Sequence, residues 1–284
     1  CHLPSGSSAG DGGVVCLRSG RGWVELGTSG CTERVVVYSL AYPSESRLNQ
    51  AFGDEMTDEA QQAAYAEHLR ALFDEADQAF RDDTVNVLAG HIFVSGGWEC
   101  DSERQIQVGG SLPVEPQALP GRAHYIALGH LHRPQEVRSS RAPCRYSGSP
   151  LAYSFSEADQ QKQVVLVDAA PGRSATVKPI MLTCGKPLKR WKAESLDEVY
   201  ALFNEPRNLE CWVDLEVKAA QPLTAAQLGD LRRVHPGIVN VRTILPEVAA
   251  EAAGRRLSEM SLTEQFRLFA VRGLGREPER ELID

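Results

Sequence analysis

Short apolar runs and one long helical pattern alternate along the first part of the chain. Four runs of apolar and β-branched residues, each bounded by glycine, proline or polar residues, predict buried strands: 35–40, 85–89, 125–128 and 164–167. Between the first two runs, apolar residues recur at helical spacing from 57 to 80, which predicts an amphipathic helix. Residues 14–18 and 23–26 flank Ser-Gly-Arg-Gly and predict a hairpin. This order of elements indicates a mixed α/β fold.

A second set of elements begins after Thr183. Its predicted order is helix, strand, helix, strand: 196–203, 212–217, 225–234 and 238–245. This set predicts a small separate α/β domain with a boundary near Gly185. Beyond it, the Ala/Glu-rich segment 247–256 predicts a linker, and 262–271 predicts a short amphipathic helix.

Two of the predicted strands end in the dipeptide Gly-His. His91 follows the run that begins at Val85, and His130 and His132 follow the run that begins at Tyr125. In an extended chain, positions i and i+2 point the same way, so His130 and His132 are expected on one side. Neutral imidazole is a common ligand of transition metals. A single His-x-His is equally consistent with two ordinary loop histidines, but the repeated context favours one shared metal site at neighbouring strand ends.

Length and composition describe an ordinary globular chain. Its 284 residues allow two modest domains, with 42% hydrophobic and 24% charged residues. No apolar run approaches the ~18 residues that span a membrane. The seven cysteines are scattered without a Cys-x-x-Cys pair, which argues against a disulfide framework or a structural zinc cluster. Reduced thiols in the cytoplasm are the simplest interpretation.

The formal net charge of −8 conceals an uneven distribution. Ten acidic residues lie between Asp54 and Asp83, against two arginines, whereas five basic residues and no acid lie between Lys178 and Lys192. One acidic face and one basic face are therefore expected, and a negative sum does not exclude nucleic-acid binding.

Several longer motifs resemble the SbcD nuclease subunits of bacterial SbcC–SbcD complexes, which belong to the calcineurin-like metallophosphoesterases. The motifs are AYPSESRLN (41–49), LAGHIFVSGG (88–97), YIALGHLHRPQ (125–135), RYSGSPLAYSFSE (145–157) and GKPLKRWKAESLDEV (185–199). The resemblance implies a metallophosphoesterase β-sandwich flanked by helices, with a small α/β capping domain. It assigns residues 1–184 to the nuclease domain, 185–246 to the capping domain and 247–284 to a linker and a partner-binding helical tail.

The same resemblance implies two manganese ions. His91 and His130 would bind one ion and His132 the other. The family's Asp-x-His and Gly-Asn-His-Asp motifs do not occur here. Because the chain begins with Cys1 rather than methionine, we expect an N-terminally truncated fragment, with the bridging aspartate and the catalytic histidine upstream. We expect such a fragment to be inactive alone, and we assign no catalytic residue within it.

The implied activity is exonuclease and endonuclease cleavage of DNA ends and hairpins during double-strand-break processing. The implied partner is an SbcC-like ATPase, with a homodimer of the nuclease subunit inside a heterotetramer and no membrane association. Four residues are candidates for DNA contact: Arg133, Ser149, Lys189 and Arg190. For Ser149 the alternative is a plain turn, and for the two residues in the basic run it is a solvated face.

Two other functions remain open from the sequence. One is hydrolysis of a small phosphate ester by the same chemistry, against which the second domain and the YSGSPLAYSFSE motif count. The other is a non-catalytic fragment that binds DNA and an SbcC-like partner, because three lone histidines hold a metal poorly.

Overall fold

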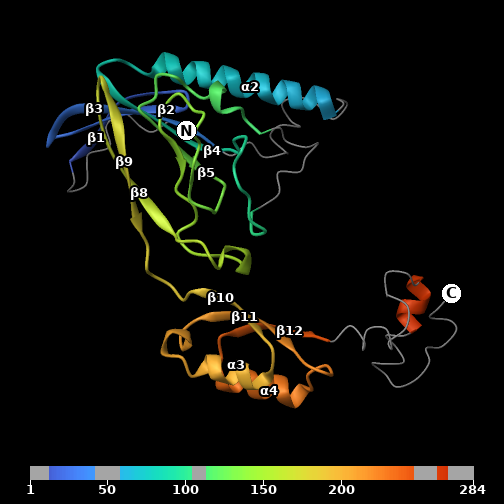
Figure 1. Ribbon diagram of the computed structural model, residues 1–284. Coiled ribbons are helices and arrows are strands. Elements are labelled where there is room, and N and C mark those ends of the chain that lie inside the picture. The colour runs from blue at the N-terminus through green and yellow to red at the C-terminus, as the bar shows by residue number, and fades with distance from the viewer. Residues whose placement is uncertain (1–12, 42–57, 104–112, 246–260, 268–284) are drawn as a thin grey trace. The chain divides into compact units, whose positions relative to one another are not determined.

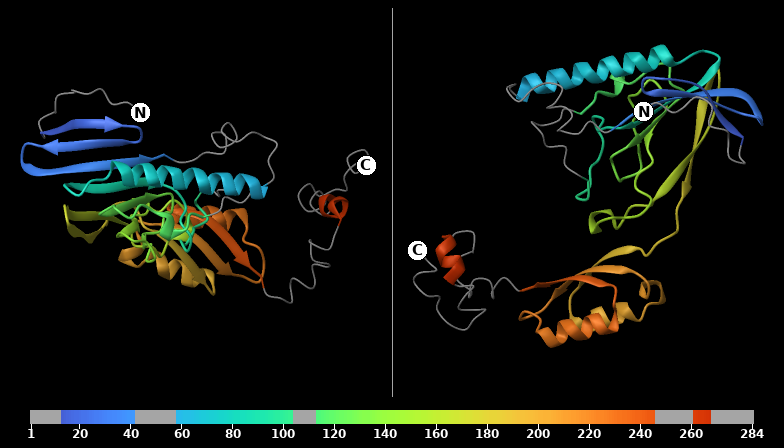
Figure 2. Two further views of the ribbon diagram at one scale, coloured as in Figure 1. Left: turned by 90° about the horizontal axis from the view of Figure 1, so that it is seen from above. Right: turned by 180° about the vertical axis from the view of Figure 1, so that it is seen from behind.

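A computed structural model describes residues 13–41, 58–103, 113–245 and 261–267. Its chain divides into two compact units, residues 1–188 and 189–284. Figures 1 and 2 show the elements of each unit. Within the described residues, no helix is both long enough and apolar enough to cross a membrane.

The first unit is built on a seven-stranded mixed sheet with the strand order β1-β2-β3-β4-β5-β7-β6. Its strands are β1 (Val14–Gly20), β2 (Trp23–Thr28), β3 (Cys31–Leu40), β4 (Thr84–His91), β5 (Tyr125–Gly129), β6 (Gln135–Glu136) and β7 (Cys144–Tyr146). The first three strands form an antiparallel meander, while β3, β4, β5 and β7 run parallel. The predicted α/β fold is confirmed.

Helix α2 (Asp58–Ala79) covers this sheet (Figure 1). Its buried residues repeat at helical spacing and include Leu69, Phe73 and Ala76. They belong to the same core cluster as Val36 of β3 and Leu88 of β4. The helix therefore connects the parallel strands β3 and β4 and buries one face of the sheet, as crossover helices do.

A two-stranded hairpin completes the first unit. It pairs β8 (Gln163–Ala170) with β9 (Arg173–Met181) in antiparallel register. Strand β9 was not predicted, because most of its side chains are exposed and the segment offers no apolar run. Two single-turn 3-10 helices lie at Pro116–Ala118 and Phe155–Glu157.

The second unit has a three-stranded sheet in the order β10-β11-β12. Its elements are β10 (Leu188–Ala193), α3 (Leu196–Phe203), β11 (Trp212–Lys218), α4 (Ala225–Val234) and β12 (Ile238–Ile244). Both helices begin at capping residues that accept a backbone hydrogen bond, Ser195 for α3 and Thr224 for α4. Of the predicted C-terminal helix, residues 262–267 are helical, and the rest lies outside the described residues, as does the predicted linker.

Candidate metal centre

His91 and His130 lie at the ends of two neighbouring parallel strands. His91 is the last residue of β4 and pairs in register with Gly129, the last residue of β5. The two imidazole rings are edge to face, with centroids 5.4 Å apart. A Cβ atom on Gly129 would lie 3.0 Å from Nδ1 of His91, so glycine allows the close approach. The predicted juxtaposition of these strand ends is therefore present.

The backbone at His130 is strained. Its φ of 113° makes it the one described residue other than glycine with a positive φ. Such conformations cost on the order of 1–3 kcal/mol and persist only where the surrounding structure enforces them. Here the strained residue is the one that turns the chain out of β5 and beside His91.

Both histidines are shifted towards their neutral form. Burial lowers the pKa of His91, and the nearby His132 lowers it further. Burial also lowers the pKa of His130, with a further contribution from His91, while Glu103 acts in the opposite direction. Neutral imidazole nitrogens are the form that binds a transition metal.

His132 is held by a different set of contacts. Its Nδ1 lies 2.8 Å from Oγ of Ser102 and 3.3 Å from Oε1 of Glu157. Its ring packs edge to face on Tyr153, with centroids 5.2 Å apart. Because Nδ1 faces these two groups, Nε2 is the nitrogen left for a ligand, an arrangement typical of metal-binding histidines.

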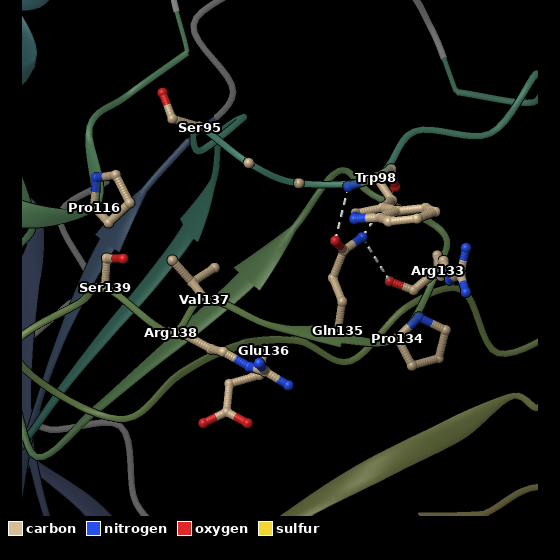
Figure 3. A pocket seen from close by; sticks show the side chains of 12 residues that line it. Ser95, Trp98, Pro116, Arg133, Pro134, Gln135, Glu136, Val137, Arg138 and Ser139 are labelled. Atoms are coloured by element: carbon tan, nitrogen blue, oxygen red, sulfur yellow. Dashed lines mark hydrogen bonds between the residues drawn. The ribbon is translucent and has the colours of Figure 1, made fainter.

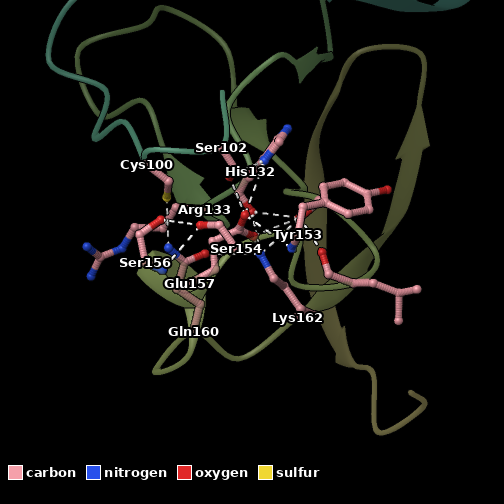
Figure 4. Close-up of polar contacts among 12 residues, drawn as sticks. Cys100, Ser102, His132, Arg133, Tyr153, Ser154, Ser156, Glu157, Gln160 and Lys162 are labelled. Carbon is pink, nitrogen blue, oxygen red and sulfur yellow. Dashed lines mark hydrogen bonds and ion pairs between the residues drawn. The ribbon is translucent and has the colours of Figure 1, made fainter. Parts of the chain in front are cut away.

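Glu157 is the centre of a buried polar cluster (Figure 4). Its side chain is fully buried and accepts hydrogen bonds from Lys162 at 2.5 Å, from Ser149 at 3.2 Å and from Ser102. Burial raises the pKa of Glu157, but the hydrogen bonds from Lys162 and Ser102 outweigh that effect and hold the pKa at about 2. The carboxylate is therefore ionised near neutral pH.

The loop that carries His132 is also fixed through its backbone. The Lys162 ammonium donates to the carbonyl oxygen of His132 at 3.0 Å, and the backbone N–H of Ser149 donates to the same oxygen at 3.0 Å. Gly148 adopts a φ of 82°, and a Cβ there would lie 2.7 Å from that oxygen. The Ser-Gly-Ser-Pro segment thus packs directly against the His132 loop.

These residues fit a metal ion as part of a ligand set. His91 and His130 offer two adjacent imidazole rings, and the lowered pKa of each favours the neutral form. Among the described residues, however, no group of three or more His, Cys, Asp or Glu side chains is arranged to hold an ion. The candidate centre therefore has two imidazole rings in edge-to-face contact, with the nearby His132 held by Ser102 and Glu157.

The four candidate DNA-contact residues have distinct surroundings. The Arg133 guanidinium lies over the Trp98 ring at 4.9 Å from its centroid. Ser149 is buried, and its hydroxyl oxygen also lies 2.7 Å from the Leu151 carbonyl oxygen, so its single proton is shared between that oxygen and Glu157. In the second unit, Lys189 donates to the Arg207 carbonyl at 2.8 Å and Arg190 lies 4.0 Å from Asp214. Contact of these four residues with DNA remains a prediction.

Three residues of the Glu157 cluster were not singled out from the sequence: Ser102, Glu157 and Lys162. Glu157 is the last residue of the RYSGSPLAYSFSE motif, but the motif does not indicate what this residue does. Ser102 and Lys162 lie in loop segments without periodicity or metal-ligand spacing. Only the folded chain brings the three together.

Similarity to known proteins shows the family of the chain. The chain is 40% identical over 262 residues to the SbcD subunit of the nuclease SbcCD from Bacillus subtilis strain 168, an alignment that covers 92% of this chain. It is 33% identical over 230 residues to the protein of the same name from Rhodobacter capsulatus, covering 75% of this chain. The chain belongs to the SbcD family. A protein of that name from Staphylococcus epidermidis is 32% identical over 134 residues.

The SbcD family model that matches is described as the type 5 capsule protein repressor C-terminal domain, and it covers residues 184–271. That range includes every element of the second unit from β10 to β12. The chain spans 66% of the length of the Bacillus relative and 56% of the Rhodobacter one, less than two thirds of either.

Proposed function

We propose that this chain contributes to the metal centre of an SbcD-type DNA nuclease that hydrolyses phosphodiester bonds at DNA ends and hairpins. The observation that carries the proposal is the pairing of His91 and His130 at adjacent strand ends in a chain of the SbcD family. The relatives named as nuclease subunits support the same chemistry.

Each histidine has a defined part in the proposed centre. His91 and His130 would hold one manganese ion through neutral nitrogens, and His132 would hold the other through Nε2. Manganese would supply Lewis-acid polarisation of the phosphodiester and a water of lowered pKa. Glu157 and Ser102 fix the orientation of the His132 ring. A two-ion centre also needs a bridging carboxylate in addition to these nitrogens.

We further propose an SbcC-like ATPase as the partner, with the nuclease subunits paired within a heterotetramer in the cytoplasm. Residues 1–184 would belong to the nuclease domain, 185–246 would form the capping domain and 247–284 the partner-binding tail. The relatives' names, which make each of them one subunit of SbcCD, support a complex. The family model matches residues 184–271, which supports grouping the capping domain with the first part of the tail as one C-terminal region.

A second function is a non-catalytic role in binding DNA and the ATPase partner. It is favoured by the lack, among the residues with described positions, of any three-ligand metal group. The two functions differ in whether His91 and His130 bind manganese.

Metal binding tests the proposal directly. We expect purified protein to bind Co²⁺ with the visible absorption of a nitrogen-ligated ion, and manganese to compete for the same site. His91→Ala and His130→Ala should each weaken manganese binding by about tenfold or more, since loss of an outer-shell partner alone costs about 10–100-fold. His68→Ala is the matched control, because His68 lies exposed on α2. Equal manganese affinity in all three variants and the wild type would refute the proposed centre.

A further inference from the structure

A cavity of about 580 Å³ opens beside the loop that carries His132 (Figure 3). Its lining includes Trp98, Arg133, Gln135 and Arg138, together with Ser95 and Ser139. The volume falls within the roughly 300–1,000 Å³ of small-molecule sites. None of the groups that orient the three histidines lines it, so the cavity is distinct from the candidate metal centre.

Trp98 is the unusual member of this lining. The residue is 67% exposed, although tryptophan is normally among the more buried residues. The Gln135 side-chain amide forms two hydrogen bonds with the backbone of Trp98. The Trp98 N–H donates to Oε1 of Gln135 at 2.8 Å, and Nε2 of Gln135 donates to the Trp98 carbonyl at 3.0 Å. The backbone that presents the exposed indole is therefore anchored, so stacking a flat ligand on it costs little ordering entropy.

The cavity lining carries two guanidinium groups, those of Arg133 and Arg138. The Arg133 guanidinium stacks over the ring, and no described carboxylate lies within ion-pair distance of Arg133 or Arg138. Glu136, the one acidic side chain among the described residues of the lining, is paired with Arg145 at 3.1 Å. An exposed aromatic ring in one cavity with two guanidinium groups, of which Arg133 lies over the ring, suits a ligand with a flat ring and a phosphate.

We propose that the Trp98 cavity binds one unpaired nucleotide, with its base stacked on the indole and its phosphate held by Arg133 and Arg138. Single-stranded nucleic acids are commonly bound in this way, by aromatic stacking within a basic groove. A base inside a duplex offers no free face for stacking, so the ligand is an unpaired nucleotide, such as one at a frayed or single-stranded terminus. This inference rests on the proposed function, since it gives the nuclease a preference for unpaired DNA ends.

A free mononucleotide offers the same chemistry as a strand end. The two sources are separated by comparing a fluorescein-labelled five-nucleotide oligo(dA) with dAMP as competitor, and with a blunt labelled duplex. Binding is measured by fluorescence anisotropy on the 284-residue chain in EDTA, so that neither cleavage nor metal binding contributes. Competition by dAMP at concentrations similar to those of the oligonucleotide identifies the free nucleotide as the ligand, and much weaker competition identifies the strand end. Both results support a nucleotide site.

We expect Trp98→Leu to weaken oligonucleotide binding about tenfold, a change typical of losing one stacked base. Trp98→Phe should retain most of the affinity, because it keeps an aromatic face. Trp212→Leu is the matched control, since Trp212 is 41% exposed in the second unit. Arg133→Ala should also weaken binding and reduce its salt dependence.

Wild-type affinity in Trp98→Leu, or no binding of the oligonucleotide by the wild-type chain, would overturn this inference. Tighter binding of the blunt duplex than of the oligonucleotide would also overturn it, if Trp98→Leu left the affinity for the duplex unchanged. None of these results depends on manganese. The cobalt and manganese titrations of the histidine variants therefore decide the proposed function separately.

Discussion

Glu157 and Lys162 form an ion pair that is almost completely shielded from water, with side-chain exposures of 0% and 9%. Removing one member of such a pair leaves the other charge buried and uncompensated, which costs about 3–5 kcal/mol. We expect Glu157→Gln to lower the free energy of unfolding by about 3 kcal/mol in urea titrations. Lys162→Met should have a similar effect. The double variant should recover part of the loss, whereas strictly additive losses would show that the two residues are not coupled.

At the same scale, the sequence predicted some site residues and missed others. The proximity of His91 and His130 was predictable, because each follows a strand and the ends of parallel strands meet at one edge. The contact of Glu157 with His132 was not, because it joins segments with no regular pattern. Trp98 gave no signal either, since exposure of a single aromatic residue depends on what the fold leaves uncovered.

Among the elements, strand β2 carries the fully buried Glu25, which joins the first three strands to the end of α2. Its carboxylate pairs with Arg18 of β1 at 2.6 Å, with Arg81 at 3.1 Å and with Arg34 of β3 at 3.6 Å. The hydrogen bond from Arg81 lowers the pKa of Glu25 most; burial opposes it, and Arg18 adds to the lowering, leaving a pKa of about 2. Arg81 also pairs with Asp83 at 2.9 Å. The ionised carboxylate thus holds a β-meander and a helix terminus together.

This shift predicts a pH-dependent stability. Because the pKa of Glu25 is depressed on folding, its contribution is complete above the unfolded value of 4.5 and is lost as the pH falls towards about 2. We expect Glu25→Gln to cost about 3 kcal/mol of unfolding free energy at pH 7. The difference from wild type should shrink between pH 4.5 and 2 in chemical denaturation curves. A difference that stays constant over that range would mean that the charge of Glu25 is not what stabilises the sheet.

Element boundaries show which local signals were sufficient. Helices α3 and α4 occupy the predicted residues, because capping residues and helical periodicity agree there. Strand β3 begins at Cys31, ahead of the predicted start at 35, because its exposed first residues continue the pairing with β2. For the residues of strand β10 the sequence indicates only a basic run and no strand. It is a strand in which Trp191 and Ala193 are buried while Arg190 and Lys192 face outwards.

At the scale of the whole chain, the basic run between Lys178 and Lys192, which overlaps β10, is less uniformly positive in the fold than in the sequence, because acidic residues of β11 lie beside it. In the second unit's sheet, Arg242 pairs with the buried Asp214 at 3.0 Å and with Glu216 at 3.1 Å. Lys192 lies 3.7 Å from Glu216. Neutralised pairs of this kind attract phosphate weakly. The uncompensated arginines of the first unit, Arg133 and Arg138, are therefore the stronger candidates for DNA contact.

At this scale we also expect the 284-residue chain alone not to hydrolyse linear duplex DNA, even with excess manganese. Two divalent ions close together repel each other unless a negative ligand bridges them, and one weakly held ion cannot stabilise both the attacking and the leaving oxygen. The described residues provide the paired imidazoles of His91 and His130 but no third ligand beside them. The measurement is release of nucleotides from end-labelled duplex, with His130→Ala assayed in parallel. Manganese-dependent cleavage by the wild-type chain that disappears in His130→Ala would show that these histidines suffice, and this account of the centre would then be wrong.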